Sequence, residues 1–209
     1  MGSISHRLSI AWPPAAASEP TSTLVLTTPK RRFIDLRASL PLTSKSLYWG
    51  IAGTSSYDPA TRTGTWTHWI DSRTDEPASD SGVMETLQNG DVLETGTMLD
   101  FDDGRVKRYE EVWRDEMGLG TRCVAVECGM AGCRGMGVIL GDWCQVLVKR
   151  DGEVSAGRWK RGEDGVWREE FRVGRVINDE FRSMLEGQVE EKKTLGGLEW
   201  VVVERHNVG

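Results

Sequence analysis

The sequence predicts an all-β protein, and three observations support that fold class. Short segments rich in β-branched and aromatic residues recur at close intervals, with Gly, Pro, Asp and Asn between them. The dipeptides Asn89-Gly90 and Asp151-Gly152 are typical of hairpin turns. Only the segment from Asp179 to Glu186 has the residue spacing of a helix. This pattern fits a β-sandwich or antiparallel barrels better than a βαβ fold or a helix bundle.

The predicted strands differ in how cleanly they alternate. In the segment Leu8-Ser9-Ile10-Ala11-Trp12 the large apolar side chains share one face, whereas from Tyr109 to Trp113 the pattern is less regular. The predicted strands, in chain order, are Arg7 to Trp12, Thr23 to Thr28, Arg32 to Leu36, Leu47 to Thr54, Gly64 to Ile70, Val92 to Met98, Val106 to Arg114, Arg122 to Glu127, Gly135 to Val148 with a break at Gly141, Glu153 to Arg161, Gly165 to Val173, and Leu198 to Arg205.

The one predicted helix is short and lies in the C-terminal half. Asn178 can cap it, and Asp179 and Glu180 suit the positive N-terminal end of a helix. We expect it to cover a barrel end or a sheet. The polar, glycine-rich segment from Asp115 to Thr121 indicates a boundary, which predicts domains over 1–118 and 119–209.

Composition excludes several classes of function. The formal net charge is -6, and no basic cluster is longer than Lys30-Arg31-Arg32, so we expect no nucleic-acid partner. No apolar run approaches the roughly 18 residues of a membrane-spanning helix, so we expect no membrane association. We see no secretory signal in the first twenty residues, which favours an intracellular protein.

The four cysteines are Cys123, Cys128, Cys133 and Cys144, and their spacing is C-x4-C-x4-C-x10-C. Structural zinc sites usually use tighter pairs, and the three histidines are remote in sequence. We therefore expect reduced thiols that pack in strands as small hydrophobic groups, with no metal and no cofactor.

The pattern Gly-x-Trp occurs four times, whereas independent placement of 24 Gly and 9 Trp in 209 residues predicts about one. The occurrences begin at Gly64, Gly141, Gly157 and Gly165. The pattern is similar to the Gly-x-Trp of lipocalin-like barrels, where a Trp closes one end. Packing is the commoner role for a Trp in such a strand.

No catalytic motif is present: the sequence contains no Gly-x-Ser-x-Gly elbow, H-E-x-x-H helix or Walker loop. The best candidate cluster is His68, Trp69 and Asp71, together with Glu94 and Tyr109. Simple alternation places His68 and Asp71 on opposite faces of one strand, so a dyad would need a second strand. His68 could act as a general acid or base if it faces a cavity, although a hydrogen-bonded structural role is more common. The candidate ligand-binding residues are Trp49, His68, Trp69, Asp71, Tyr109, Trp113 and Trp143.

Several stretches resemble the fungal Hri family, which is named for interaction with a casein-kinase-type protein kinase. They include Trp49 to Thr54, His68 to Ser72, Glu94 to Gly96, Tyr109 to Trp113, Arg134 to Gln145, and Gly197 to Glu204. The resemblance implies two consecutive lipocalin-like barrels and no established reaction or catalytic residue. The chain departs from the family pattern at Val146, where a Gly usually follows, and the loops Asp58 to Gly64 and Asp75 to Gly90 look individual.

Two classes of function stay open. The first is a non-catalytic binding or interaction protein, cytoplasmic and also nuclear, whose barrels hold a small apolar ligand or present a surface to a kinase-type partner. The second is a small isomerase or cyclase of fungal metabolism that acts in an apolar barrel cavity. A cavity that contains an ionisable group would favour ligand binding or catalysis, whereas a solid barrel would leave only the surface.

Overall fold

The computed structural model describes residues 2–101, 103–116, 122–175 and 192–206, and its regular structure is almost entirely β-strand. One short 3₁₀ helix spans Leu42–Ser44. No helix in these ranges is long and apolar enough to cross a membrane. The strands are β1 (Ser3–Ala11), β2 (Thr21–Thr27), β3 (Arg32–Ser39), β4 (Leu47–Asp58), β5 (Thr63–Asp71), β6 (Ala78–Thr86), β7 (Val92–Asp100), β8 (Arg105–Asp115), β9 (Cys123–Met130), β10 (Cys133–Leu140), β11 (Trp143–Arg150), β12 (Glu153–Arg161), β13 (Trp167–Val173), β14 (Lys192–Leu195) and β15 (Leu198–His206).

The first eight strands form a closed antiparallel barrel. Each strand pairs with the next along the chain, and β8 pairs with β1 to close the ring. Closure leaves no unpaired barrel edge. The all-β prediction is confirmed, and the N-terminal half is a barrel as expected.

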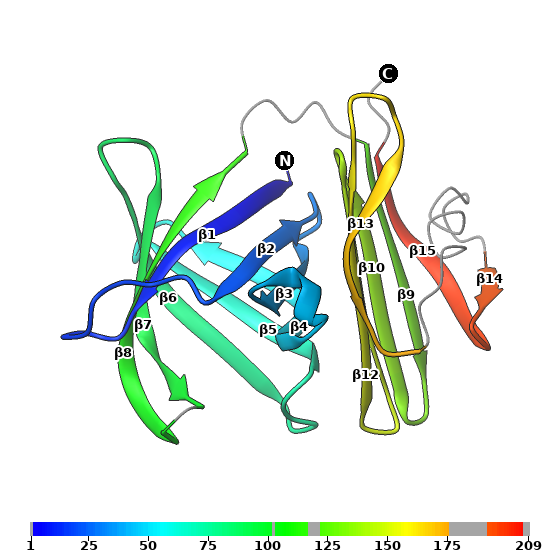
Figure 1. Cartoon of the computed structure of the whole chain (residues 1–209), viewed down its shortest axis with the longest axis horizontal. Helices are drawn as coiled ribbons and strands as arrows, with labels where there is room; N and C mark the ends of the chain where they lie inside the picture. The colour runs from blue at the N-terminus through cyan, green and yellow to red at the C-terminus, as the bar shows by residue number, and fades with distance from the viewer. Residues whose placement is uncertain (1, 102, 117–121, 176–191, 207–209) are drawn as a thin grey trace.

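The C-terminal half corrects one prediction. Its strands form a seven-stranded sheet in the order β13-β12-β11-β10-β9-β15-β14. Among the described residues β13 and β14 do not pair with each other, so this half is an open sheet and not the second closed barrel that we expected. The sheet stands as a layer beside the barrel (Figure 1). The helix predicted over 179–186 lies outside the described residues.

Every predicted strand overlaps an observed one, although β1 begins four residues before its prediction and β4 ends four residues after its own. Strands β6 and β14 were not predicted. β6 has the sequence ASDSGVMET, in which no regular alternation of apolar and polar residues appears. A strand whose inner face meets polar groups does not carry the period-two signal on which the prediction depends.

The main hydrophobic core lies outside the barrel, between β2, β3, β4 and the C-terminal sheet. Strand β3 alternates so that Ile34 and Leu36 belong to this shared core while Asp35 and Arg37 line the barrel cavity. The buried residues of this shared core are Ile4, Leu24, Leu26, Ile34, Leu36, Ala38, Ala52, Ile70, Cys123, Ala125, Met136, Val138, Leu140, Trp143, Leu147, Ala156 and Phe171. Because both halves contribute to it, barrel and sheet stabilise each other.

Two buried polar side chains cross this contact. Arg158 donates to the carbonyl oxygen of Leu36 at 2.5 Å and to that of Ser22 at 3.2 Å. Gln145 Nε2 lies 3.1 Å from the carbonyl oxygens of both Leu24 and Ile34. Burial lowers the pKa of Arg158 to about 10. The guanidinium therefore stays charged at neutral pH, and its donors are paired with backbone and side-chain oxygens.

The four Gly-x-Trp patterns have two structural causes. In β5 and β12 the glycine makes room for the ring two residues later: a Cβ at Gly64 or Gly157 would lie 2.7 Å or 2.3 Å from the ring of Trp66 or Trp159. Residues two apart share a face of a strand, which brings the ring over the glycine. Gly141 and Gly165 instead have positive φ angles of 58° and 76° and form turns. The rings of Trp66 and Trp159 therefore pack over their glycines as the packing interpretation expects, and the ring of Trp66 also lines the barrel cavity.

Candidate functional site: the barrel interior

The barrel contains a cavity of about 720 Å³ that opens at one end. Its rim is made of exposed residues at the starts of odd-numbered strands and the ends of even-numbered ones, including Arg31, Arg62 and Glu85. An antiparallel barrel brings those strand ends to the same side. Apolar groups on the wall are Val25, Phe33, Ile51, Trp66, Met84, Val92, Met98 and Trp113.

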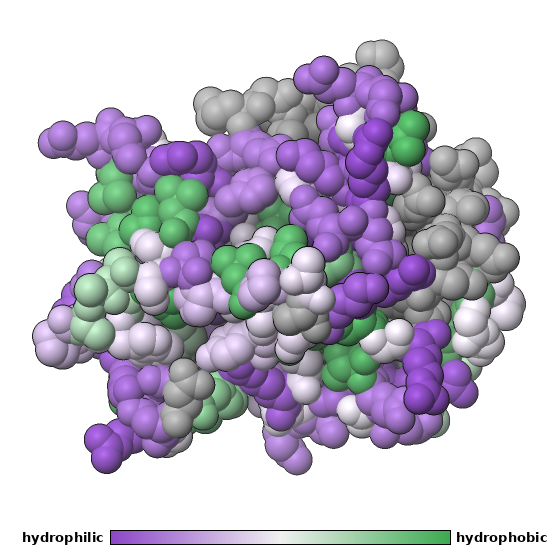
Figure 2. Space-filling view, viewed as in Figure 1, coloured by the Kyte–Doolittle hydropathy of each residue, from purple (hydrophilic) through white to green (hydrophobic). Residues whose placement is uncertain are grey.

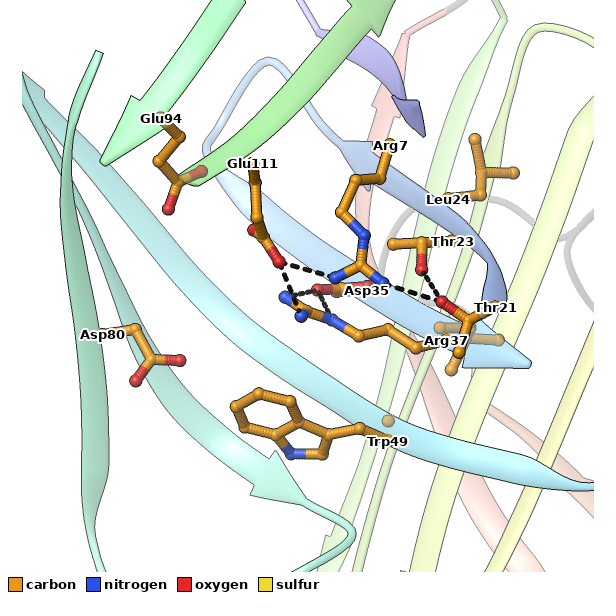
Figure 3. Close-up of polar contacts among 12 residues, drawn as sticks. Arg7, Thr21, Thr23, Leu24, Asp35, Arg37, Trp49, Asp80, Glu94 and Glu111 are labelled. Carbon is orange, nitrogen blue, oxygen red and sulfur yellow. Dashed lines mark hydrogen bonds and ion pairs between the residues drawn. The ribbon is translucent and has the colours of Figure 1, made fainter. Parts of the chain in front are cut away.

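The deep wall carries a buried ionic cluster, shown in Figure 3. Arg7 Nη1 donates to Glu111 Oε1 at 2.5 Å, and Arg37 Nη1 donates to the same oxygen at 3.1 Å. Arg37 also donates through Nε to Asp35 Oδ2 at 3.0 Å. On its far side Arg7 pairs with Glu19 and donates to Thr21. Both guanidinium groups are thus already neutralised by carboxylates of the barrel.

Asp35 is buried, and one of its two carboxylate oxygens accepts no hydrogen bond. Oδ1 of Asp35 has no hydrogen-bond partner, and the residue lines the cavity. Burial raises the pKa of Asp35, and the charge of Arg37 only partly opposes that change. An unpaired buried acceptor costs free energy. Trp113 Nε1, a donor on the same cavity wall, also lacks a partner.

Glu94 and Glu111 are direct cross-strand partners on β7 and β8. Two carboxylates in that position repel each other when both are charged. Burial first, and then the charge of Glu111, raises the pKa of Glu94 to about 8. Tyr109 donates its hydroxyl to Glu94 Oε1 at 2.6 Å, and burial together with Glu94 raises the pKa of that hydroxyl. Glu94 is therefore mostly protonated at neutral pH in the empty barrel.

Gly82 and Gly96 leave space for these two side chains. The glycines face each other across β6 and β7. A Cβ at Gly82 would lie 2.6 Å from Glu94, and one at Gly96 would lie 2.8 Å from Tyr109. Larger residues at either position would displace the Glu94–Tyr109 pair.

His68 and Asp71 do meet, which corrects the expectation from simple alternation. The distance between His68 Nδ1 and Asp71 Oδ2 is 2.9 Å. The register between β4 and β5 shifts between Ala52 and Gly53, so Trp69 is an extra residue in β5. Such a bulge turns Trp69 and Ile70 outward together, and it returns Asp71 to the face of His68. A Cβ at Gly53 would lie 2.0 Å from the carbonyl oxygen of Thr67, so the bulge requires glycine there.

Charge on His68 is stabilised from two sides. Nε2 of His68 forms an ion pair with Asp80 Oδ2 at 3.1 Å. Burial lowers the pKa of His68, but Asp71 and Asp80 outweigh it and raise the value to about 9. Burial opposes ionisation of Asp71, but hydrogen bonds from His68, from the Arg73 amide and from Trp49 lower its pKa overall. Trp49 Nε1 donates to Asp71 Oδ1 at 2.9 Å.

An aromatic stack lies at the barrel end opposite the mouth. The guanidinium carbon of Arg73 lies 3.8 Å from the ring centroid of Phe101 and 4.8 Å from that of Trp49. The rings of Trp49 and Phe101 meet edge to face at 5.7 Å. Cation–π and edge-to-face contacts of this kind stabilise a packed layer. This layer indicates that the cavity has one entrance.

The seven candidate residues selected from the sequence do not form one site: five lie in the barrel interior and two lie elsewhere. Trp49, His68, Asp71, Tyr109 and Trp113 lie in the barrel interior, and His68, Tyr109 and Trp113 line the cavity itself. The remaining two lie elsewhere. Trp143 belongs to the core between barrel and sheet, and it donates to Glu116 at 2.8 Å. Trp69 faces the sheet and lines a second cavity of about 710 Å³, which is bounded by the β5–β6, β9–β10 and β11–β12 connections.

Sequence reasoning did not select Arg7, Asp35, Arg37 or Glu111. One signal was available: in the segment Phe33-Ile34-Asp35-Leu36-Arg37 two charged residues alternate with apolar ones inside a β-rich region. Alternation alone assigns such residues to solvent. The direction of Asp35 and Arg37 follows only from the tertiary structure, in which the C-terminal sheet covers the outer face of β3.

Metal and thiol chemistry receive no structural support. Among the described residues no three His, Cys, Asp or Glu side chains are arranged to hold a metal ion. The four cysteines are free and buried in β9, β10 and β11. Burial raises the pKa of Cys123 and of Cys128 to about 12, which keeps these thiols protonated and unreactive.

Comparisons with known proteins agree on the family and the fold. A family model described as "Protein HRI1" matches residues 3–204. The crystal structure of an uncharacterized protein from Saccharomyces cerevisiae is similar with a TM-score of 0.81 and 18% identity, over 99% of this chain and 100% of that one. That identity supports the fold alone. No curated protein matches the chain. Because the family model covers nearly the whole chain, the protein belongs to the HRI1 family.

Proposed function

We propose that this protein binds a small molecule inside its N-terminal barrel. The single observation that carries the proposal is the cavity of about 720 Å³, open at one end, with two unpaired polar atoms on its wall. Ligand pockets typically measure about 300–1,000 Å³ and combine apolar walls with a few placed polar groups. The wall of this cavity has that composition, although it is more polar than the apolar interior expected from the sequence.

The ionic cluster supports binding because stability does not require it. Replacing a buried ion pair by packed apolar residues is often neutral or stabilising. The larger apolar core lies on the outer side of the barrel, against the sheet, and a smaller cluster of Phe33, Trp49 and Ile51 packs inside the barrel. We therefore interpret the ionic cluster as a polar binding surface for a ligand and not as packing of the barrel interior. It comprises Arg7, Asp35, Arg37 and Glu111.

The surface offers less support for docking a protein. In the view of Figure 2 most of the surface is hydrophilic, and the hydrophobic areas are separate patches. A protein-binding face usually presents a continuous apolar area. The kinase-type partner and the cytoplasmic or nuclear location stay predictions from the family resemblance.

Native mass spectrometry of the full chain from its own host tests the proposal. We expect a retained small molecule. The variant Met84→Trp fills the cavity and should abolish the retained mass, whereas Val83→Trp, on the outer face of the same strand, should keep it. Equal occupancy in the two variants would place the ligand outside the barrel and contradict the proposal.

One observation favours an enzyme as the second candidate. The pKa of Glu94 near 8 lies close to neutrality, where a general acid or base works best. An isomerase or cyclase would use Glu94 with Tyr109 at the cavity wall. Incubation of the recovered ligand with fresh protein checks this: a chemical change that Glu94→Gln abolishes would establish catalysis, and an unchanged ligand would exclude it.

A further inference from the structure

We propose that the barrel cavity selects an organic cation, an amine with an apolar body, over neutral and anionic molecules of the same shape. The inference rests on the proposed binding function and names the chemical class of its ligand. Three features of the cavity wall support it. Its cations are paired with carboxylates of the protein, some of its acceptor atoms have no donor, and apolar side chains lie beside them.

The cations of the wall are committed to carboxylates of the protein. Arg37 is held by Asp35 and Glu111, at 2.9 Å and 3.1 Å. Arg7, behind the wall, is held by Glu19 and Glu111. An anionic ligand would have to displace one of these carboxylates, which would leave a buried charge without a partner. The deep cavity therefore has no cation available for an anion.

Carboxylates are in excess over cations in the same region. Arg7 and Arg37 form ion pairs with Glu19, Asp35 and Glu111, and the charge of Arg37 acts on Glu94 without an ion pair. His68 pairs with both Asp71 and Asp80. Asp35 Oδ1 has no hydrogen-bond partner although the side chain is buried. Buried acceptors are usually paired, so this oxygen is available to a donor of the ligand. Glu94 faces Glu111 across the sheet, so a positive charge between them would relieve their repulsion. A ligand ammonium would therefore pair with Asp35 Oδ1 and reduce the repulsion between Glu94 and Glu111.

The apolar part of the ligand has a place on the same wall. Trp66, Met84, Met98 and Trp113 line the same cavity as these carboxylates. Aromatic faces attract cations, and methionine adapts to irregular shapes. At the rim both signs occur, as Arg31 and Arg62 lie with Glu85 and Asp115. Trp113 Nε1 is a neutral donor. The selectivity for charge must therefore come from the deep carboxylates.

Binding of an ammonium group is coupled to loss of a proton. At neutral pH the raised pKa of Glu94 favours its protonated form, and a bound cation favours its carboxylate, so the proton leaves to solvent. The charged and titratable groups that act on Glu94 are Glu111 and Tyr109 of β8, and Arg37 and Asp35 of β3. Asp80 of β6 and His68 of β5 face the same cavity. Affinity for an amine should accordingly rise as pH increases toward 8.

Calorimetric titration of the full chain with matched probes tests the inference. The probes have three apolar bodies, phenylethyl, indolylethyl and cyclohexylethyl, and each is used as ammonium, alcohol and carboxylate. We expect each ammonium to bind about 10- to 100-fold more tightly than its alcohol, as charge-assisted hydrogen bonds predict, and each carboxylate to bind more weakly than its alcohol. Ammonium affinity should rise between pH 6 and pH 8 while alcohol affinity stays constant.

Variants locate the selectivity. Glu94→Gln keeps an acceptor for Tyr109 and should remove the pH dependence together with most of the ammonium preference, and Asp35→Asn should reduce that preference further. Glu110→Gln, on the outer face of β8, is the matched control and should retain both. Binding without preference for the ammonium form, or a preference that survives in both deep variants, would overturn the inference while the binding function stands. If no probe binds and Met84→Trp changes no retained mass, the binding function itself is overturned.

Discussion

The two faces of strands β2, β3 and β4 meet opposite environments. Their outer face packs against the C-terminal sheet in a core that contains Leu24, Ile34 and Leu36. Their inner face borders a hollow that contains Asp35 and Arg37. The larger apolar core therefore lies outside the barrel, whereas the interior combines a smaller apolar cluster with buried charges.

The largest effect should come from pH, because two groups that line the barrel cavity have raised pKa values. The pKa values of Glu94 and His68 are raised to about 8 and about 9. A raised pKa means that the folded state binds more protons than the unfolded state, so the free energy of unfolding should fall as pH rises from about 5 to about 9. Each group contributes about 1.4 kcal/mol per pH unit where it alone titrates.

Urea unfolding of the wild type and of Glu94→Gln from pH 5 to pH 9 measures this slope. The variant should lose less stability than the wild type over that range. Equal slopes would show that the barrel interior does not hold a protonated Glu94.

The next effect compares two tryptophans, one on each side of the barrel wall. Trp143 is buried in the shared core, whereas Trp113 borders the cavity. Trp143→Ala should cost about 3–5 kcal/mol because dense packing surrounds the ring. Trp113→Ala should cost clearly less, since part of its ring surface faces space already. Denaturant unfolding gives both values, and equal losses would contradict the contrast between a packed outer face and a hollow inner one.

A smaller effect tests the polar crossing between barrel and sheet. Arg158→Met keeps the apolar stem but removes the donors to the carbonyl oxygens of Ser22 and Leu36. Each buried acceptor left without a donor costs about 1–3 kcal/mol. The midpoint of urea unfolding should therefore fall. An unchanged midpoint would mean that these oxygens find other donors, and that the crossing does not help to join the two halves.

The smallest effect concerns an ion pair on the surface. Arg168 donates to Asp164 at 2.9 Å through Nη1, and both side chains are exposed. Water screens such pairs, so Arg168→Ala should leave the melting temperature unchanged. A loss comparable to that of Arg158→Met would show that charge pairing stabilises this protein regardless of burial.

The residues around β5 show which parts of the candidate site could be predicted from the sequence and which could not. The strand itself was predicted over Gly64 to Ile70, and His68 and Asp71 were selected as candidates. Their contact was not predicted, because the period-two rule fails at the bulge residue Trp69. The bulge depends on the close approach of Gly53 to Thr67, and that approach exists only after β4 and β5 have paired.

Local properties of the chain determined the all-β class, most strand positions and the packing role of Trp66 and Trp159, because these follow from residue spacing and from contacts within one strand. Tertiary structure alone decided which face of each strand turns inward, whether a sheet closes, and which charges meet. Arg7, Asp35, Glu94 and Glu111 come from four different strands, β1, β3, β7 and β8. Alternation defines two faces of a strand, but only long-range pairing and the sheet that covers one face determine which of them lines the cavity.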